Sequence, residues 1–546
     1  MTTLKAVRGT RDLLPPETAL WNRIEAIARA VFARYNFGEI RTPIFEDTAL
    51  FARGVGEETD IVSKEMYTWE DGERFDPSAM ADRWRRLNYE RFDDFGESGS
   101  ASGDPIDMAP RDINAGYAEL VVFRAHESDE ALQVLRTALS KAASTPPQFS
   151  GYGPKVRARL VVPSPGGERS ESETADGIFI EKIPGSFYKS SQSLTLRPEN
   201  TAGVVRGYIE HKLGETGQLQ KLYYIGPQFR RERPQKGRYR QFSQIGAEVI
   251  GPPSAGSESP LRDAEILEML ATLLNELGIT GWKLEINSVG SPADRARYNE
   301  TLRAALVPVV SQMCVDCQRR AVTNPLRVLD CKVPADQPII EKLPMIGDWL
   351  DKASKDHFAA VTMALDKVEV PYTRNHRLVR GLDYYTRTTF EFTHGGLGAQ
   401  NALLGGGRYD GLSEMLGGPK APGIGFAMGE DRLVLTLLAQ ESAVPQVLAD
   451  AYIAPLCDEK RPDVLVLVNA TALFLARELR RQGFRVELGD GSFRLKKSFE
   501  AGNKMARHIV ILGENELESG ILTVKDFATG IQTKVPRAEL AAFLSA

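Results

Sequence analysis

The sequence predicts an α+β protein of several domains, on the strength of three observations. Residues 221–248 read as an apolar strand, a basic loop and a returning strand, inside a longer run of antiparallel strand patterns over 190–251. Residues 260–375 hold helical stretches, and strand and helix patterns alternate from 462 to 546, which indicates a sheet with helices on its faces. A chain of 546 residues is also too long for one core, so two to four domains are expected.

The first segment, residues 1–71, is predicted to contain a loop, a helix and two strands. The helix covers about 17–35, because apolar side chains recur there at helical spacing. Residues 39–45 read as a strand that Pro43 ends, and Glu65–Asp71 as a second strand.

Residues 72–189 form a separate inserted module in this interpretation. The segment contains Gly/Ser/Pro-rich stretches typical of flexible loops, such as 96–103 and 163–168. Between these loops, strand and helix patterns alternate, so we expect a small α/β module. The predicted elements are a strand at Glu119–Arg124, a helix at Glu127–Ala143 and a strand at Val156–Val162.

The remaining elements follow from apolar periodicity. A helix is predicted over Asp263–Leu277 and a linker over 441–461. The last domain, 462–546, is predicted to alternate strand, helix, strand, helix, strand at Val464–Val468, Thr471–Arg481, Phe484–Leu488, Phe493–Ala506 and His508–Leu512.

Composition limits the classes of function. The apolar fraction of 42% and the charged fraction of 26% are ordinary for a globular enzyme. The net charge of -5 argues against a globally basic nucleic-acid protein, so any RNA contact would use local patches. No apolar run approaches the ~20 residues that a membrane helix needs, and the N-terminus lacks a signal-peptide core. We therefore expect a cytoplasmic protein with no membrane partner.

The four cysteines leave two interpretations open. Cys314, Cys317 and Cys331 could supply three zinc thiolates, but no second C-x-x-C or suitably spaced histidine completes the set, and Cys457 lies far along the chain. Reduced, unligated thiols are therefore expected, with a structural zinc as the alternative. No pair of the six histidines has metal-binding spacing, so no metal site is predicted.

The loop inside the predicted hairpin is the main functional signal. Six basic residues crowd around a Pro/Gly turn: Arg230, Arg231, Arg233, Lys236, Arg238 and Arg240. Guanidinium groups match phosphate geometry bidentately, although a basic loop by itself is more often a solvated surface. What favours phosphate binding is the set of motifs on either side.

These motifs are Leu194–Thr201 before the loop, and Leu378–Tyr385, Gly405–Asp410 and Gly423–Arg432 after it. In this order they resemble the histidyl-tRNA synthetase family of class II aminoacyl-tRNA synthetases. The resemblance runs from about 5 to 70 and from about 190 to the C-terminus.

The resemblance implies a domain organisation. Residues 1–71 and 190–440 would form the class II antiparallel sheet with flanking helices, including a helical insertion over about 260–375 that touches the acceptor arm of tRNA. Residues 462–546 would be an anticodon-binding α/β domain, and the first helix and strand would make a homodimer interface. Residues 72–189 stand where the family has a short turn. They could be a spacer, a module for protein interaction or dimer bracing, or a tRNA contact.

The activity that the resemblance implies is ATP-dependent attachment of L-histidine to tRNA(His) through a histidyl-adenylate, with Mg²⁺ bound to ATP. The alternative is a non-catalytic paralogue, similar to the regulatory subunit of ATP phosphoribosyltransferase. Such paralogues usually lack the anticodon domain and part of the arginine set, whereas this chain keeps both, which favours the ligase.

The resemblance also assigns roles at the nucleotide. Arg230 would grip the α-phosphate and the histidine carboxylate, and Arg380 would be the catalytic arginine that supplies fixed charge at the α-phosphate. The γ-phosphate end would meet Arg238 and Arg432. Glu232 and Gly425 complete the predicted ATP site, and Gln235 and Arg240 are predicted to meet the acceptor end of tRNA.

Histidine would be bound by Glu199, Gln244 and Glu248, with Tyr385 and Tyr409 closing the pocket. A site that hydrogen-bonds a polar side chain rejects analogues lacking it, so no editing domain is expected. Asn200 departs from the family, which more often has glycine there; the expected consequence is a changed turn beside Glu199.

Overall fold

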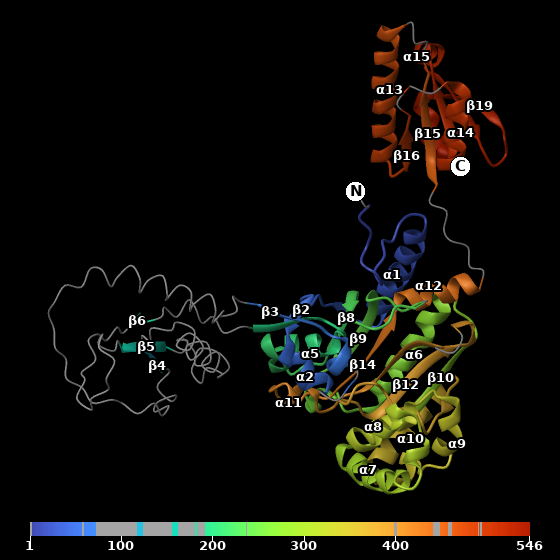
Figure 1. Cartoon of the computed structure of the whole chain (residues 1–546). Helices are drawn as coiled ribbons and strands as arrows, with labels where there is room; N and C mark the ends of the chain where they lie inside the picture. The colour runs from blue at the N-terminus through green and yellow to red at the C-terminus, as the bar shows by residue number, and fades with distance from the viewer. Residues whose placement is uncertain are drawn as a thin grey trace, which may run out of the picture. The chain divides into compact units, whose positions relative to one another are not determined.

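The structure is a computed structural model of the chain (Figure 1). It describes residues 3–56, 59, 61–71, 192–235, 237–397, 401–440, 448–456, 461–489, 491 and 494–545, together with the strand backbones at 117–123, 155–161 and 181–182. The chain divides into two compact units. Unit 1 comprises Met1–Arg11 and Ile27–Thr436, and unit 2 comprises Asp12–Ala26 and Leu437–Ala546.

Unit 1 is built on an eight-stranded sheet whose six central strands are antiparallel, as the sequence predicted. In spatial order the strands are β1 (Gly38–Glu39), β8 (Gln220–Phe229), β9 (Gln241–Ile250), β14 (Gly423–Gly429), β13 (Ala402–Arg408), β12 (Thr386–His394), β10 (Trp282–Ser288) and β11 (Thr373–Arg374). The edge strands β1 and β11 pair in parallel with their neighbours.

The predicted hairpin is present as β8 and β9. Its pairs run from Gln220 with Ile250 to Phe229 with Gln241, so residues 230–240 form the basic loop. Helix α6 (Pro260–Glu276), predicted over 263–277, begins at the N-cap Ser259 and buries Ile266, Leu267 and Leu270. It packs against α10 (Lys352–Lys367) and the sheet.

A second sheet of three strands shows where the inserted module is attached. Its order is β2 (Phe45–Asp47), β7 (Gln192–Leu196) and β3 (Tyr67–Asp71). Asp71 pairs with Gln192, so residues 72–191 leave and re-enter at one end of a hairpin. From the module the structure describes β4 (Tyr117–Phe123) and β5 (Lys155–Val161), which are parallel, and β6 (Glu181–Lys182). Both predicted strands are present, and the helix predicted at 127–143 lies outside the described residues.

The strand predicted at 39–45 is wrong as a single element. Residues 38–39 and 45–47 belong to two strands in different sheets. Pro43 stands between them and cannot donate a backbone hydrogen bond to a ladder. The preceding helix, α1 (Glu17–Arg34), agrees with the prediction.

The helical part of unit 1 has a small core of its own. Helices α7 (Pro292–Leu306), α8 (Val315–Thr323) and α9 (Gln337–Ile340) lie close to one another beside α10 (Figure 1). With the turn η7 (Pro325–Asp330), they bury residues such as Tyr298, Leu302 and Cys317. We call this part, residues 289–350, the helical subdomain.

Unit 2 corrects two predictions. Val464–Val468 is not a strand but the start of α13 (Pro462–Arg481), and the predicted linker at 441–461 contains β15 (Ala449–Pro455). A short apolar run cannot distinguish a helix from a strand. Here Val466 is 71% exposed while Val468, Ala472 and Leu475 are buried, which is the spacing of a helix.

The sheet of unit 2 has the order β16 (Val486–Leu488), β15, β17 (Ala506–Leu512), β18 (Ile521–Asp526) and β19 (Gln532–Pro536). Strands β16, β15 and β17 are parallel, and the other pairs are antiparallel, so the predicted sheet with helices on its faces is a mixed one. Helix α14 (Leu495–Met505), predicted at 493–506, packs against β15 and β17.

The remaining helices are short. They are α2 (Thr48–Val55), α5 (Thr201–Glu210), α11 (Leu412–Met415), α12 (Glu430–Ala439), α15 (Glu514–Ser519) and α16 (Leu540–Ser545), with turns at η1 (Ile61–Glu65), η4 (Leu213–Thr216), η5 (Pro253–Ala255), η6 (Val310–Gln312), η8 (Pro334–Asp336), η9 (Ile346–Trp349), η10 (Gly395–Leu397) and η11 (Arg537–Glu539).

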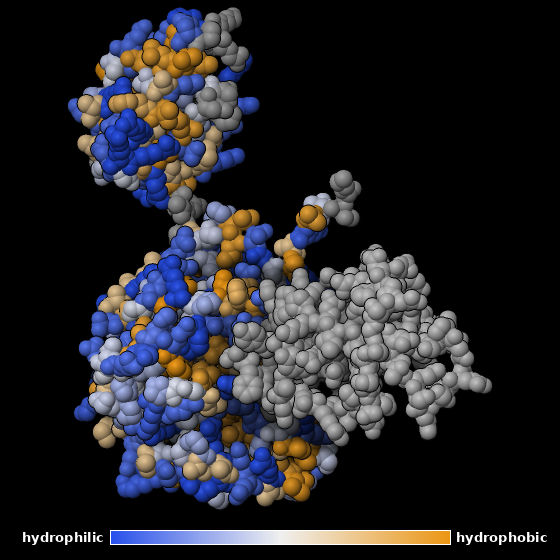
Figure 2. Space-filling model, turned by 90° about the vertical axis from the view of Figure 1, so that its left-hand side faces the viewer, coloured by the Kyte–Doolittle hydropathy of each residue, from blue (hydrophilic) through white to orange (hydrophobic). Residues whose placement is uncertain are grey.

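The described part of the chain contains no helix with the length and apolarity needed to cross a membrane. On the face that Figure 2 shows, hydrophilic residues dominate the described surface and apolar residues form patches between them.

Candidate active site

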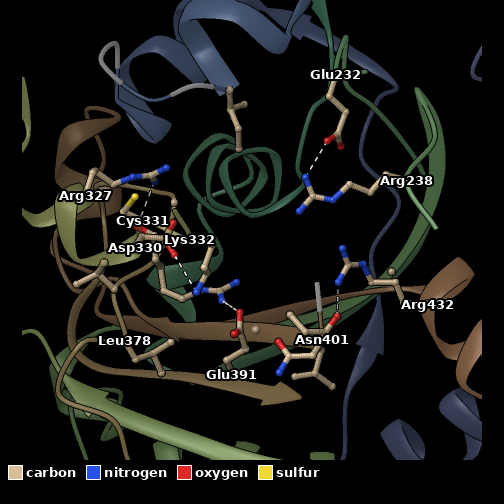
Figure 3. A pocket seen from close by; sticks show the side chains of 18 of the residues that line it. Glu232, Arg238, Arg327, Asp330, Cys331, Lys332, Leu378, Glu391, Asn401 and Arg432 are labelled. Atoms are coloured by element: carbon tan, nitrogen blue, oxygen red, sulfur yellow. Dashed lines mark hydrogen bonds and ion pairs between the residues drawn. The ribbon is translucent and has the colours of Figure 1, made fainter. Parts of the chain in front are cut away.

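A cavity of about 1110 Å³ in unit 1 brings together arginines from distant parts of the sequence. Arg230 and Arg238 come from the β8–β9 loop, Arg380 from the segment before β12, and Arg432 from α12. Figure 3 shows Arg238 and Arg432 reaching toward the same space, with Glu391 and Lys332 elsewhere on the wall. All four arginines predicted to bind the nucleotide therefore line one cavity.

The hairpin loop is held by contacts within it and with neighbouring segments. Nε of Arg230 donates to the carbonyl of Pro198 at 2.9 Å, and its guanidinium lies 5.3 Å from the ring centre of Phe242. Arg238 forms an ion pair of 2.9 Å with Glu232, which also lines the cavity. The predicted ATP residue Glu232 therefore positions an arginine of the loop.

Arg380 is oriented by Glu391, which the sequence did not reveal, and by Gly405 of the predicted Gly405–Asp410 motif. Its Nη1 donates to Oε1 of Glu391, on β12. Gly405, paired with Glu391 on the adjacent strand β13, leaves room for the guanidinium, since a Cβ there would lie 2.3 Å from Nη2 of Arg380. Burial tends to lower the pKa of Arg380, but Glu391 outweighs it and the pKa is raised, so the charge is permanent. Only the side-chain contacts identify Glu391 and place Gly405 beside Arg380.

Arg432 lies in a positive environment. Its Nη1 donates to the carbonyl of Ala402. Burial and the charge of Arg238 lower the pKa of Arg432. Like charges around one cavity are disfavoured until an anion binds, so this arrangement favours a polyanionic ligand.

The residues predicted to bind histidine fall into two groups. Gln244 lines the cavity, and its Oε1 is buried without a hydrogen-bond partner among the described residues. Glu199, Glu248, Tyr385 and Tyr409 do not line it, and form a buried polar cluster instead. The two groups meet on β9, where Gln244 and Glu248 are four residues apart and so point to the same face.

Glu248 is the centre of the buried cluster. It accepts hydrogen bonds from Oγ1 of Thr201 at 2.7 Å and from the hydroxyl of Tyr409 at 2.8 Å. Burial raises the pKa of Glu248 to about 8; the two hydrogen bonds offset this in part, and the charge of Glu199 adds to it. Burial also raises the pKa of Tyr385 to about 12. A cationic ligand beside Glu248 would favour its ionised form.

Glu199 caps the helix that follows it. Its carboxylate accepts from the backbone N–H of Thr201 at 2.8 Å and of Ala202 at 3.0 Å, at the start of α5. Burial raises the pKa of Glu199. Asn200 has φ −117°, which any residue adopts, and its Oδ1 accepts from Thr42 at 2.6 Å. The departure at 200 therefore does not require a glycine backbone.

Three further predicted residues, which do not belong to the buried cluster, also lie outside the cavity wall. Gly425 is on β14 opposite Glu248, whereas Ala427 and Gly429 of the same strand line the cavity. Gln235 is exposed and exchanges backbone hydrogen bonds with Arg238. Arg240 donates from Nη1 to the carbonyl of Arg8 at 3.1 Å, which ties the loop to the N-terminal segment.

The helical subdomain contributes a wall that no predicted site residue occupies. Arg327 and Lys332 line the cavity, and Nη1 of Arg327 donates to the carbonyl of Arg380 at 3.4 Å. Cys314, Cys317 and Cys331, which were predicted to be unligated, lie close together here, and the carboxylate of Asp336 lies beside them. Sequence spacing was considered only for cysteine or histidine as a fourth ligand, so this carboxylate was not predicted.

Comparison with known proteins places these features in one family. The family profile described as Histidyl-tRNA synthetase matches residues 186–433, and the profile described as Anticodon binding domain matches 450–546. The histidine–tRNA ligase of Koribacter versatilis is 57% identical over 542 residues, covering 99% of this chain and 96% of the relative. That of Solibacter usitatus is 44% identical over 545 residues, covering 100% and 99%.

Solved structures agree with the sequence comparisons. Apo histidyl-tRNA synthetase from S. aureus superimposes with a TM-score of 0.64 at 29% identity, over 100% of both chains. A Bacillus halodurans protein described as an ATP phosphoribosyltransferase regulatory subunit/histidyl-tRNA synthetase reaches a TM-score of 0.52 at 16% identity, covering 94% of this chain and 99% of that chain, a likeness of fold alone.

Proposed function

The chain belongs to the histidyl-tRNA synthetase family and attaches histidine to tRNA, and we propose that it activates histidine in the cavity lined by Arg230, Arg238, Arg380 and Arg432. The observation that carries this proposal is the convergence of these four cations, from three segments of the chain, on one cavity. A regulatory subunit without catalysis is not favoured, because the curated relatives above, matched over nearly the whole chain, are ligases.

The reaction needs positioning and charge more than proton transfer. In the proposed step, the carboxylate of histidine attacks the α-phosphorus of ATP in line, and pyrophosphate leaves. Arg230 and Arg380 hold the α-phosphate, while Arg238 and Arg432 hold the γ-phosphate end. Mg²⁺ enters with ATP as part of the substrate. The bond of Arg380 to Glu391 fixes its guanidinium before the reaction, so no reorganisation is needed as charge develops.

Histidine recognition is proposed to extend from Gln244 to Glu248. A carboxylate that accepts from Thr201 and Tyr409 keeps further lone pairs for a substrate N–H. Glu199 and Tyr385 belong to the same buried cluster, so the pocket has a polar lining. An amino acid with an apolar side chain would leave the polar groups of this lining without hydrogen-bond partners and would therefore be rejected. The buried Oε1 of Gln244, which has no hydrogen-bond partner in the described part of the chain, supports a ligand at this end of the cavity.

Transfer to tRNA(His) is proposed to use two regions. Unit 2 would hold the anticodon, as the family profile over 450–546 suggests. The exposed loop residue Gln235 and the neighbouring Arg240 would meet the acceptor end. Replacing Gln235 with alanine should slow charging and leave adenylate formation unchanged; equal effects on both steps would refute this assignment.

A cytoplasmic homodimer is proposed for the active enzyme. Phe45 on β2 is 53% exposed and Trp69 on β3 is 40% exposed, and their ring centres lie 6.0 Å apart. An exposed aromatic pair of this kind is typical of a surface that another subunit covers. Sedimentation of the full chain should give the mass of two subunits, and a single monomeric species would contradict the proposal.

The direct test of the function is histidine-dependent exchange between ATP and pyrophosphate. The purified chain should exchange label with histidine and not with the other amino acids, and should charge tRNA(His). A chain that binds histidine but supports no exchange would refute catalysis and support a regulatory role.

A further inference from the structure

Four potential metal ligands meet at the edge of the helical subdomain. Cys314 stands just before α8, Cys317 lies in its first turn, Cys331 follows η7, and Asp336 ends η8. Their ligand atoms all lie within 4.8 Å of one another. The start of α8, the residue after η7 and the end of η8 therefore bring three cysteine sulfurs and one carboxylate together.

Two of the distances between ligand atoms are close to those of tetrahedral coordination. Sγ of Cys314 and Sγ of Cys331 are 3.9 Å apart, and Sγ of Cys331 is 3.3 Å from Oδ2 of Asp336. Bonds of about 2.3 Å to sulfur and about 2.1 Å to oxygen would place neighbouring sulfurs about 3.8 Å apart, and sulfur and oxygen about 3.6 Å apart. The cysteines are free, so a disulfide does not explain their approach.

Three of the four ligand residues are buried. Cys317 is 0% exposed, Cys331 is 6% exposed and Asp336 is 1% exposed. The carboxylate of Asp336 accepts from the backbone N–H of Cys314 at 3.1 Å and 3.2 Å and lies beside the sulfur of Cys331. A bound cation would stabilise a polar cluster that is enclosed in this way.

We propose that Cys314, Cys317, Cys331 and Asp336 form a structural zinc site. Three thiolates select a soft divalent cation over Mg²⁺ or Ca²⁺, and four protein ligands leave no open position for a substrate. Backbone N–H groups orient the set, because Cys314 N–H donates to Asp336 at 3.1 Å and Val333 N–H donates to Sγ of Cys331 at 3.4 Å.

The site ties a wall of the cavity to the catalytic arginine. The segment between Cys317 and Cys331 carries Asn324 and Arg327. Nδ2 of Asn324 donates to Oδ1 of Asp383 at 2.8 Å, and Arg327 donates to the carbonyl of Arg380 at 3.4 Å. A metal that fixes both ends of this segment holds the loop of Arg380 in place.

The test is the metal content of the full-length protein by mass spectrometry after dialysis. The natural chain should carry about one zinc per subunit. Cys317→Ser and Asp336→Asn should lose most of it. The matched controls are Asp316→Asn, an exposed carboxylate between the first two cysteines, and Cys457→Ser; both should keep the full content. Equal zinc in the ligand variants and the controls would overturn the site.

A second measurement does not depend on the folding of the variants. Apo protein, prepared by reduction and chelation, is titrated with Co²⁺, which should give the visible and sulfur-to-cobalt charge-transfer bands of tetrahedral thiolate coordination. Zinc should bleach these bands and restore the melting temperature lowered by chelation. Absence of the bands, together with a melting temperature that zinc does not change, would refute the proposal.

Discussion

Gly425 and Glu248 face each other across the β14–β9 pair so closely that a Cβ at 425 would lie 1.6 Å from Oε2 of Glu248. The glycine therefore makes room for a fully buried carboxylate. This relationship gives Gly425, expected at the nucleotide, a steric role at the proposed histidine pocket. It also shows that the position of Glu248 is determined by backbone packing as well as by its hydrogen bonds to Thr201 and Tyr409.

Replacing Glu248 with glutamine should weaken histidine binding by about 10- to 100-fold, because an amide leaves a buried polar contact with the substrate unmatched. ATP binding should change far less, since Glu248 does not line the arginine cavity. Calorimetry with each ligand measures both effects. Glu341→Gln, at an exposed carboxylate, is the matched control. Unchanged histidine affinity in Glu248→Gln would show that another group reads the imidazole.

The raised pKa of Glu248 also predicts how stability depends on pH. The folded chain holds the proton up to about pH 8, whereas the unfolded chain releases it near the ordinary value of 4.5. The folded state thus binds more protons over this range, so the free energy of unfolding falls as the pH rises, by up to about 1.4 kcal/mol per unit.

Glu248→Gln removes this dependence. Urea unfolding at several pH values between about 5 and 8 should show the variant gaining stability relative to the natural chain as the pH rises. Glu341→Gln should follow the natural chain throughout. A difference between Glu248→Gln and the natural chain that is constant with pH would mean that Glu248 is ionised in the folded protein.

Arg380→Ala should lower the rate of adenylate formation by about 10²–10³, because it removes a fixed positive charge at the proposed reacting phosphate. ATP binding should fall less, since the three other arginines proposed to bind ATP remain in the cavity wall. Single-turnover measurement of the adenylate separates the two effects. Arg41→Ala, at an exposed arginine, is the control. A single-turnover rate close to that of the natural chain would rule out Arg380 as the main electrostatic catalyst.

The sequence predicted the parts of the site that are local in the chain. The Arg230–Arg240 loop belongs to one hairpin whose strands, turn residues and charges are adjacent in sequence. Its position between two paired strands could therefore be predicted from the sequence alone. Glu391 was missed because its contact with Arg380 depends on the tertiary structure. The Gly405–Asp410 motif was recognised, but the place of Gly405 beside the Arg380 guanidinium follows only from the pairing of β12 with β13. Asp336 was missed because carboxylates are too common for spacing to single one out.

The errors in the fold have a similar cause. Val464–Val468 was predicted as a strand because five consecutive apolar residues fit a buried strand as well as a helix, and only the tertiary packing of α13 decides between them. The backbone angle of Asn200, an ordinary φ of −117°, could not be predicted from the sequence either.

Asp263→Asn should destabilise unit 1 by about 3–5 kcal/mol, because it leaves the fully buried Arg408 without its main countercharge. Burial tends to raise the pKa of Asp263, but Arg408 and His357 lower it to about 2. The stability from this carboxylate is therefore present above its ordinary value near 4 and lost as the pH falls toward 2. Urea unfolding at neutral pH measures the loss. Asp316→Asn should have no such effect, and equal midpoints for the two variants would contradict the assignment.

The inserted module should be dispensable for histidine activation. Asp71 pairs with Gln192 and Trp69 with Leu194, so the hairpin of β3 and β7 is closed at the point where the module leaves. Added length at such a point costs little in loop entropy. We therefore expect that a short Gly-containing turn in place of 73–189 preserves the fold of unit 1 and the exchange of pyrophosphate.

Measuring exchange and tRNA charging separately on this deletion distinguishes the roles open to the module. Retained exchange with retained charging would indicate a spacer or a surface for protein interaction, and sedimentation of the same variant would show whether it braces a dimer. Loss of charging alone would indicate a tRNA contact, for which the basic strand β5, Lys155–Val161, is the first candidate. Loss of exchange in a variant that keeps the melting transition of the natural chain would show that the module is part of the active site, contrary to the attachment seen at Asp71 and Gln192.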